Sequence, residues 1–268
     1  MITVKVEKCV ILAAGLSSRL FPATKAVPKP MFPIYDKPII QILVEQVKET
    51  GIEDIAIVTS PLTDLIESHF LPNKELADEL IMKGKEDLAF QINNIVPDVN
   101  LSFFKQSIPG AAGGLLAAEE WLNKEPFLLL YCDEVVFDDH LPGFLDSYKG
   151  NHLIFSTTRP AVEAINYGTI ISDSEDRALS IVEKQPVVDR DFVDIVLGKS
   201  ILNSNIFEAI DQIEKDKSGE LVLTNAIAVD LEEVPVYIHK TNCEVFDTGN
   251  YNGYLDACLA YKARRRSK

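Results

Sequence analysis

The feature that most constrains the fold of this chain is the alternation of short apolar runs with segments of helical periodicity. Cys9–Leu12, Ile55–Val58 and Phe127–Tyr131 are unbroken apolar runs, which are typical of strands buried on both faces of a parallel sheet. Between the first two, Ile39–Thr50 repeats its apolar residues at helical spacing and stops at Gly51. The sequence therefore predicts an α/β fold with a mixed, mainly parallel central sheet.

Further segments continue this alternation to the end of the chain, less regularly in the second half. Helices are expected over residues 63–70, 74–94, 111–122, 203–215, 221–232 and 250–265. Strands are expected over residues 99–104, 153–157, 169–172, 179–182, 194–198 and 234–239. Because no linker, repeat or low-complexity stretch interrupts the pattern, we expect residues 1–268 to form a single domain.

Composition and charge limit the ligands and the location of the protein. No apolar run is long enough to cross a membrane, and the formal net charge is −15. So acidic a chain is unsuited to nucleic acid, since a phosphate backbone needs a positive protein surface. Four scattered cysteines without a C-x-x-C pair indicate reduced thiols. We therefore expect a cytoplasmic protein that binds neither nucleic acid nor membrane.

A long irregular loop, residues 12–38, follows the first predicted strand. Five prolines interrupt it, so it cannot be a continuous helix. Loops of this length are usually functional, and ligands of doubly wound sheets bind at the carboxyl ends of strands, where this loop begins. The segment from Lys8 to Tyr35 carries four cations and no acid, although the chain is acidic overall. This local charge favours a phosphate ligand.

The residue types of this loop suit a triphosphate. Ala13, Ala14 and Gly15 leave backbone N–H groups open to close approach by a ligand, and Arg19 and Lys29 supply fixed positive charge. The alternative is an ordinary loop with solvated charges. This interpretation is favoured for any single lysine, whereas the combination of small residues and cations favours the phosphate ligand. Neither a Walker A loop nor a G-x-G-x-x-G motif is present.

The stretch LAAGLSSRLFPATKAVPKPMFPIYDKPII resembles the signature of sugar-1-phosphate nucleotidylyltransferases, usually L-A-A/G-G-x-G-S/T-R followed by P-K. It is most similar to the bacterial UTP–glucose-1-phosphate uridylyltransferases. The resemblance implies a Rossmann-like three-layer α/β/α fold of the nucleotide-diphospho-sugar transferase type, in which this loop wraps a nucleoside triphosphate. It also implies that Arg19 holds the β- and γ-phosphates and that Lys29 contacts the phosphates around the reacting centre. Ser17 replaces the second glycine of the pattern, and it would be strained if the position needs a positive φ.

Two segments in the middle of the chain extend the resemblance. Gln106 precedes a glycine turn at Gly110, and the resemblance assigns both to the nucleobase; plain helix packing explains these residues equally well on their own. Asp133 directly follows a predicted buried strand, where the residues alone allow either a solvated strand end or a Mg²⁺ ligand. The family reads G-D-D/N at this point, so the resemblance implies a Mg²⁺ ligand, although Cys132 and Glu134 depart from the pattern.

Short patches in the second half resemble the sugar site of the family. Gly168 matches a glycine that lies against the sugar ring, and Gly198 matches the glycine of G-R-Y. Glu183 and Lys184 match E-K-P, whose glutamate binds sugar hydroxyls and whose lysine binds the sugar phosphate. Without the other patches, this pair would be ordinary surface charge. Asp247, in D-T-G, matches D-x-G-N/T and is implied as the second Mg²⁺ ligand.

The resemblance covers nearly the whole chain, with one further departure at Asn225, which replaces an aspartate. It implies that about residues 1–135 bind the nucleotide and about residues 136–268 bind the sugar phosphate and supply a closing helix. Nucleoside triphosphate and sugar-1-phosphate would react to give nucleotide sugar and pyrophosphate. Extra helical sequence at residues 71–96 is similar to the uridylyltransferases and favours UTP over dTTP. Another nucleotide or sugar, and a binding-only paralogue, remain the alternatives, and the family implies a homodimer or homotetramer.

Overall fold

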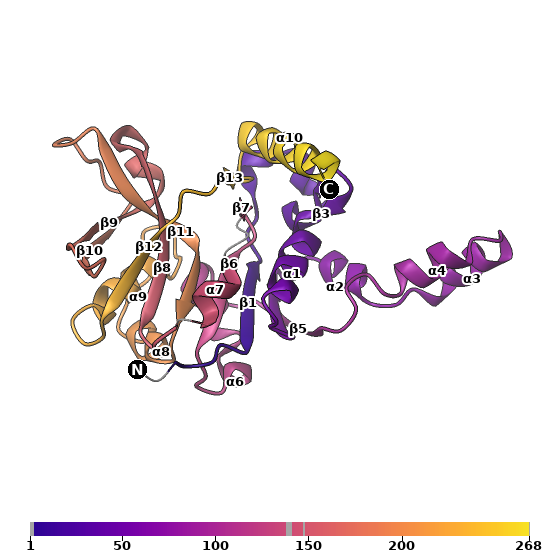
Figure 1. The fold of residues 1–268 in the computed structure, drawn as a ribbon, viewed down its shortest axis with the longest axis horizontal. Coiled ribbons are helices and arrows are strands. Elements are labelled where there is room, and N and C mark those ends of the chain that lie inside the picture. The colour runs from indigo at the N-terminus through magenta and orange to yellow at the C-terminus, as the bar shows by residue number, and fades with distance from the viewer. Residues whose placement is uncertain (1–2, 138–140, 147, 268) are drawn as a thin grey trace.

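The structure is a computed structural model that describes residues 3–137, 141–146 and 148–267, and a mixed sheet of nine strands runs through this part of the chain (Figure 1). The strands of the first half are parallel and lie in the spatial order β6, β1, β4, β5. Their bounds are Lys8–Ala13 (β1), Asp54–Thr59 (β4), Asn100–Lys105 (β5) and Phe127–Tyr131 (β6). The predicted parallel strands of this half are therefore confirmed.

Antiparallel pairing begins beyond β6. β11 pairs antiparallel with β6, β8 and β9, and β12 lies parallel to β8. The bounds are His152–Pro160 (β8), Gly168–Ser172 (β9), Ala178–Glu183 (β10), Phe192–Leu202 (β11) and Val236–Lys240 (β12). The register of β11 against β8 shifts between Val196 and Ser200. Such an irregularity changes the local direction of the strand, and Gly198 lies within it.

Two small antiparallel ladders stand apart from the main sheet. β2 (Pro33–Ile34) pairs with β3 (Lys37–Pro38), and β7 (Glu134–Val136) pairs with β13 (Val245–Asp247). Segments of two or three residues are too short to show periodicity, so neither ladder is predicted from sequence. The β7–β13 ladder joins the end of β6 to the start of the closing helix.

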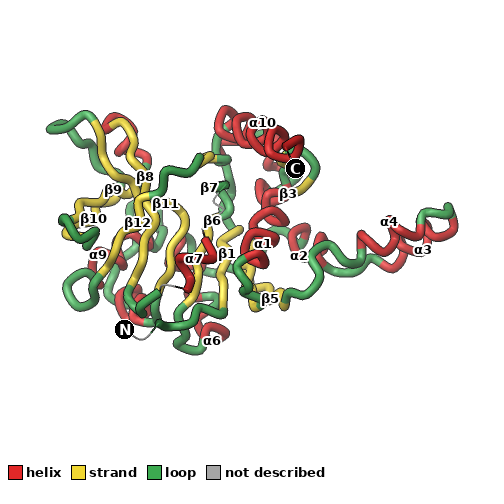
Figure 2. The backbone as a smooth tube through the Cα atoms, in the orientation of Figure 1, coloured by secondary structure: helices red, strands yellow, loops and turns green. Residues whose placement is uncertain are grey.

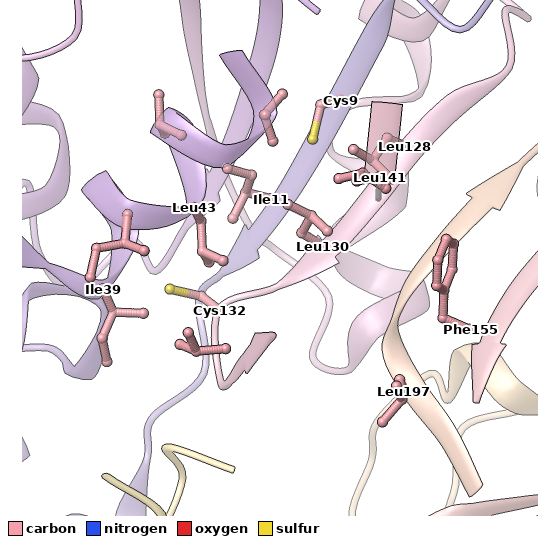
Figure 3. Packing of buried hydrophobic residues seen from close by; sticks show 14 of the residues in the cluster. Cys9, Ile11, Ile39, Leu43, Leu128, Leu130, Cys132, Leu141, Phe155 and Leu197 are labelled. Atoms are coloured by element: carbon pink, nitrogen blue, oxygen red, sulfur yellow. The ribbon is translucent and has the colours of Figure 1, made fainter. Parts of the chain in front are cut away.

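Helices cover both faces of the sheet, which confirms the predicted three-layer α/β/α fold. Successive residues of β1 point to opposite faces. Cys9 and Ile11 pack in the hydrophobic cluster that contains α1 (Figure 3). Val10 packs in the cluster that contains α5, α8 and α9. The helices are α1 (Ile39–Glu49), α2 (Leu65–Phe70), α3 (Lys74–Met82), α4 (Glu86–Ile92), α5 (Ala111–Leu116), α6 (Glu119–Leu122), α7 (Leu141–Asp146), α8 (Asn205–Ile210), α9 (Leu223–Asp230) and α10 (Tyr251–Ser267).

Some expected helices are shorter or divided. The segment 74–94 forms α3 and α4, because Gly84 takes a φ of +68° between them. The helix expected over 203–215 ends at Ile210. Just beyond it, the Asp216 carboxylate accepts hydrogen bonds from the N–H groups of Ser218 and Glu220 (2.8 and 3.0 Å), which fixes a turn in place of further helix.

α3 and α4 form an arm that projects from the body of the molecule (Figures 1 and 2). Asn73 caps α3 by accepting a hydrogen bond from the Leu76 N–H at 3.0 Å. Within the two helices, only Ala77 and Ala89 are buried. Among the described residues, no helix is both long and apolar enough to span a membrane.

Candidate active site

A cleft of about 700 Å³ opens at the carboxyl ends of the parallel strands, the edge at which α/β sheets bind their ligands. The thirteen residues that the sequence assigns to nucleotide, sugar phosphate or metal all line this cleft. They are Ala13, Ala14, Gly15, Arg19, Lys29, Gln106, Gly110, Asp133, Gly168, Glu183, Lys184, Gly198 and Asp247. The fold thus brings together residues from both halves of the chain, while the role of each one stays a prediction.

The loop after β1 is held in short 3-10 turns. Arg19 lies in the turn Ser18–Leu20, which the fully buried Leu20 side chain anchors, and Lys29 begins the turn Lys29–Met31. Ser17 has a φ of 51°, so this position does require the left-handed conformation for which glycine is usual. A Cβ atom on Gly15 would meet nothing within 4 Å, which leaves space for close approach by a ligand.

Two of the four cations in the segment from Lys8 to Tyr35 do not line the cleft. Lys8 begins β1 and therefore lies at the opposite edge of the sheet, where it pairs with Glu125 at 3.0 Å and donates to the Trp121 carbonyl at 2.9 Å. Lys25 is exposed and is not among the lining residues. The positive charge that faces the cleft from this loop therefore comes from Arg19 and Lys29.

The β7–β13 ladder sets the two candidate metal ligands side by side. Asp247 pairs with Glu134 in the ladder, and the Thr248 N–H and hydroxyl donate to the Asp133 carbonyl at 2.8 and 3.0 Å. Among the described residues, no three His, Cys, Asp or Glu side chains are grouped to hold a metal ion by themselves. Two carboxylates fit Mg²⁺, because this ion commonly takes one or two protein carboxylates and completes its shell with phosphate oxygens and water.

Each of these carboxylates lies beside a cation of the loop. Lys29 Nζ lies 3.7 Å from Asp133 Oδ2, and Arg19 Nη1 lies 3.5 Å from Asp247 Oδ2. Lys29 is buried, with 6% of its surface exposed, so its charge acts where screening by solvent is weak. The cleft therefore presents alternating positive and negative groups at the junction of the two halves.

The Glu134 side chain connects the carboxyl edge of the sheet to β11. Its Oε2 oxygen accepts a hydrogen bond from the Gly198 N–H at 2.6 Å. Burial and the neighbouring charge of Asp133 raise the pKa of Glu134 to about 8, while the bond from Gly198 acts in the opposite sense. Gly198 itself lies against Tyr131, whose Cβ would be 2.6 Å from a Cβ at this position. Only glycine allows β11 to approach β6 so closely here.

The turn after β5 is braced by Gln106. Its side-chain nitrogen donates to the carbonyls of Ile108 and Gly110 at 2.7 and 2.8 Å, which leaves Oε1 as its remaining polar atom. Gly110 has a φ of +95°, and a Cβ there would lie 2.3 Å from the Leu221 carbonyl oxygen. Glycine is therefore required by both backbone conformation and space. The turn is packed against the segment that leads into α9.

Glu183, at the end of β10, is held by two neighbours. The Thr224 hydroxyl donates to its Oε2 at 2.5 Å, and Lys184 Nζ lies 3.4 Å from its Oε1. A Cβ on Gly168 would lie 3.1 Å from the same Oε2, so this glycine forms the wall beside the carboxylate. Lys184 has a φ of 48°, an uncommon conformation that recurs at functional sites.

Sequence reasoning missed several lining residues. Ser60, Pro61 and Leu62 follow β4, and Tyr131 ends β6. Their place at the carboxyl end of a parallel strand, or directly after it, is the signal that identifies them. Conversely, Asn225 does not line the cleft, so its departure from the family pattern leaves the cleft wall unchanged.

Together, the fold and the cleft define an α/β protein in which cations lie beside a pair of carboxylates at the carboxyl edge of the sheet. The Nucleotidyl transferase family matches residues 8–264 of the chain. The UTP–glucose-1-phosphate uridylyltransferase YngB of Bacillus subtilis strain 168 is 33% identical over 266 residues, which cover 94% of this chain and 88% of that protein. The chain belongs to the nucleotidyl transferase family, and the resemblance stated from its motifs is confirmed.

Similarity to solved structures supports the assignment of the chain to this family. A UTP-bound UGPase from Acinetobacter baumannii is 30% identical, with a TM-score of 0.84, and the match covers 96% of this chain and 93% of that one. A UDP-glucose pyrophosphorylase complexed with UDP-glucose is 27% identical, with a TM-score of 0.83 and coverage of 97% and 99%. The similarity thus extends over both halves of the sheet.

Proposed function

We propose that the protein transfers uridylyl from UTP to glucose-1-phosphate and releases pyrophosphate. The observation that carries the proposal is the meeting of Asp133 and Asp247 in one cleft with cations from both halves of the chain. The relatives named for UTP, glucose-1-phosphate and UDP-glucose support this choice of substrates. In this proposal about residues 1–135 bind the nucleotide, and about residues 136–268 bind the sugar phosphate.

The two subsites follow from the lining residues. Ala13, Ala14 and Gly15 would admit the phosphates to the backbone, with Arg19 and Lys29 as countercharges. The braced turn of Gln106 and Gly110 would face the uracil ring, and Gln106 Oε1 could accept from its N3–H group. On the other side, Glu183 would accept from sugar hydroxyls, with Gly168 and Gly198 as the adjoining walls and Lys184 on the sugar phosphate.

The reaction needs no nucleophilic side chain. An oxygen of the sugar phosphate is already ionised, and it would form the new bond to the α-phosphorus of UTP. The bond from that phosphorus to the bridging oxygen breaks, and pyrophosphate leaves with the electron pair. Lys184 and Lys29 would draw the two anions together, and Arg19 would offset the charge of the departing pyrophosphate. Mg²⁺ held by Asp133 and Asp247 would supply further neutralisation of the phosphate oxygens.

A nucleotide panel tests this proposal. Pyrophosphate release is measured with Mg²⁺ and glucose-1-phosphate, using UTP, dTTP, CTP, ATP and GTP separately. We expect strong release with UTP. Release with another nucleotide instead would keep the reaction and change the substrate. Tight binding of UTP without release under any combination of sugar phosphates would favour a binding-only protein.

We further propose that the protein works in the cytoplasm as a homodimer or homotetramer. The described structure contains four free cysteines and no disulfide, which is typical of reducing compartments. Light scattering coupled to size exclusion tests the oligomer, and a mass of about 30 kDa at micromolar concentration would contradict it.

A further inference from the structure

The guanidinium group of Arg19 lies against the segment that joins β13 to α10. Asp247 Oδ2 lies 3.5 Å from Arg19 Nη1 at one side. A Cβ atom on Gly249 would lie 2.5 Å from Arg19 Nη2, so the guanidinium packs directly over the backbone of this glycine. The Asn250 amide donates to Asp247 Oδ2 at 3.1 Å, and its Oδ1 accepts from the Gly253 N–H at 2.9 Å. The start of α10 and Asp247 are therefore held as one unit.

Tyr251, the first residue of α10, extends this contact to the loop itself. Its hydroxyl lies 3.1 Å from the carbonyl oxygen of Leu20 and 3.0 Å from that of Phe21. These two residues directly follow Arg19. Tyr251 is not among the residues that line the cleft, so it would act on a ligand there indirectly, through the residues that it contacts.

Other hydrogen bonds near this point lie within the loop itself, since the N–H groups of Leu20 and Phe21 donate to the carbonyls of Ser17 and Ser18 at 3.0 and 3.1 Å. The buried Leu20 side chain fixes it from the protein interior, whereas Phe21 is 54% exposed. The hydrogen bond from the Tyr251 hydroxyl to this backbone reduces the conformational freedom of the loop before a ligand binds. The loop therefore loses less conformational entropy when it orders around the ligand. Removing that freedom in advance strengthens binding without a new contact to the ligand.

We propose that Tyr251 is a positioning residue for the triphosphate. It holds the Leu20–Phe21 backbone against α10 and thereby keeps Arg19 directed at the β- and γ-phosphates beside Asp247. The inference rests on the proposed function, because it needs a nucleoside triphosphate in this cleft.

The test is the affinity of Tyr251→Phe for nucleotides of different length, measured by calorimetry with Mg²⁺ present. We expect the Kd for UTP to rise about 3- to 10-fold, which corresponds to the net loss of one hydrogen bond. The Kd for UMP should stay within about twofold of the wild-type value, because UMP lacks the phosphates assigned to Arg19. A general loss of structure would weaken both nucleotides alike.

Tyr254→Phe is the matched control. Its hydroxyl donates from the same helix to the Pro33 carbonyl at 2.7 Å, and neither residue lines the cleft. Equal weakening of UTP by both variants, or equal weakening of UTP and UMP by Tyr251→Phe, would overturn the inference. If wild-type protein binds UTP and Tyr251→Phe binds it equally well, the inference alone fails. If wild-type protein binds no UTP, the proposed function fails together with it.

Discussion

Asp133 and Asp247 each lie beside a cation that the proposal assigns to a phosphate, at 3.7 and 3.5 Å. A metal-bound triphosphate would replace both contacts at once: the carboxylates would turn to the metal, and Lys29 and Arg19 to phosphate oxygens. The arginine of the Arg19–Asp247 pair is mostly exposed, so this pair contributes at most about 1 kcal/mol and its exchange opposes binding little, and the two contacts are long, at 3.5 and 3.7 Å. They nevertheless keep the acidic pair neutralised and the cations in place.

Substitution of either carboxylate tests this assignment. Asp133→Asn and Asp247→Asn should each lower kcat at least about 100-fold, since a phosphoryl-type reaction depends on charge neutralisation at the transferred group. The thermal midpoint should change little, because both groups lie at the cleft. Asp64→Asn, which removes an exposed carboxylate paired with Lys105, serves as the charge-matched control. Near-normal turnover by either cleft variant would refute its role as a metal ligand.

Alanine substitutions at Gly110 and Gly84 would separate the energetic cost of backbone strain from the cost of steric overlap. Both have a positive φ, but only at Gly110 would a Cβ overlap another segment, at 2.3 Å from the Leu221 carbonyl oxygen. Gly84→Ala should destabilise the protein by about 1 kcal/mol. Gly110→Ala should cost at least about 2 kcal/mol more and weaken UTP binding, because the turn and the start of α9 must separate. Equal midpoints in chemical denaturation would contradict this explanation.

Among the elements, the arm formed by α3 and α4 differs most from the sheet in how few of its side chains are buried. Its helices have nine and seven residues and bury little more than two alanines. Isolated helices of this length are marginal in water. In contrast, β1 and β4 are buried on both faces.

Amide hydrogen exchange should reveal this difference. We expect exchange in α3 and α4 to be at least about 100-fold faster than in β1 and β4, since local opening of the arm exposes little apolar surface. Mass spectrometry of peptic peptides gives the two rates in one experiment. Protection of the arm equal to that of β4 would show that another surface covers it.

Sequence alone predicts the regular elements better than their contacts. The runs at 9–12, 55–58 and 127–131 lie inside β1, β4 and β6, because buried parallel strands need unbroken apolar sequence. The break between α5 and α6 and the β7–β13 ladder carry no comparable pattern. The cleft residues were found through motifs, whereas the bond from Gly198 to Glu134 and the contact of Tyr251 with the loop depend on tertiary arrangement. Such contacts join residues far apart in the chain, and no local spacing encodes them.

On the scale of the whole molecule, the cleft joins the parallel half of the sheet to the half that contains β9, β10 and β11. A ligand that fills it contacts both halves, and unfolding of either half releases it. A nucleotide bound in the first half would reach the second half through Mg²⁺ held by Asp133 and Asp247, so nucleotide binding with Mg²⁺ should stabilise the molecule as one unit.

Thermal unfolding checks this coupling. UTP with Mg²⁺ at a hundredfold excess over its Kd adds about 2.7 kcal/mol, which raises the Tm of a chain of this size by about 5 °C. The whole transition should move without splitting. A shift in only one of two resolved transitions would show that the halves unfold separately, and an unchanged Tm would argue against UTP binding.

The central claim is that the α-phosphate of the nucleotide, with its uridine, passes to the sugar phosphate. The most direct measurement supplies UTP labelled with ³²P at either the α- or the γ-phosphate, together with glucose-1-phosphate, Mg²⁺ and wild-type protein. We predict that the α-label enters a UDP-sugar and the γ-label enters pyrophosphate, in equal amounts. Transfer of the γ-label to the sugar product, or α-label that remains in UTP while both substrates are saturating, would contradict it.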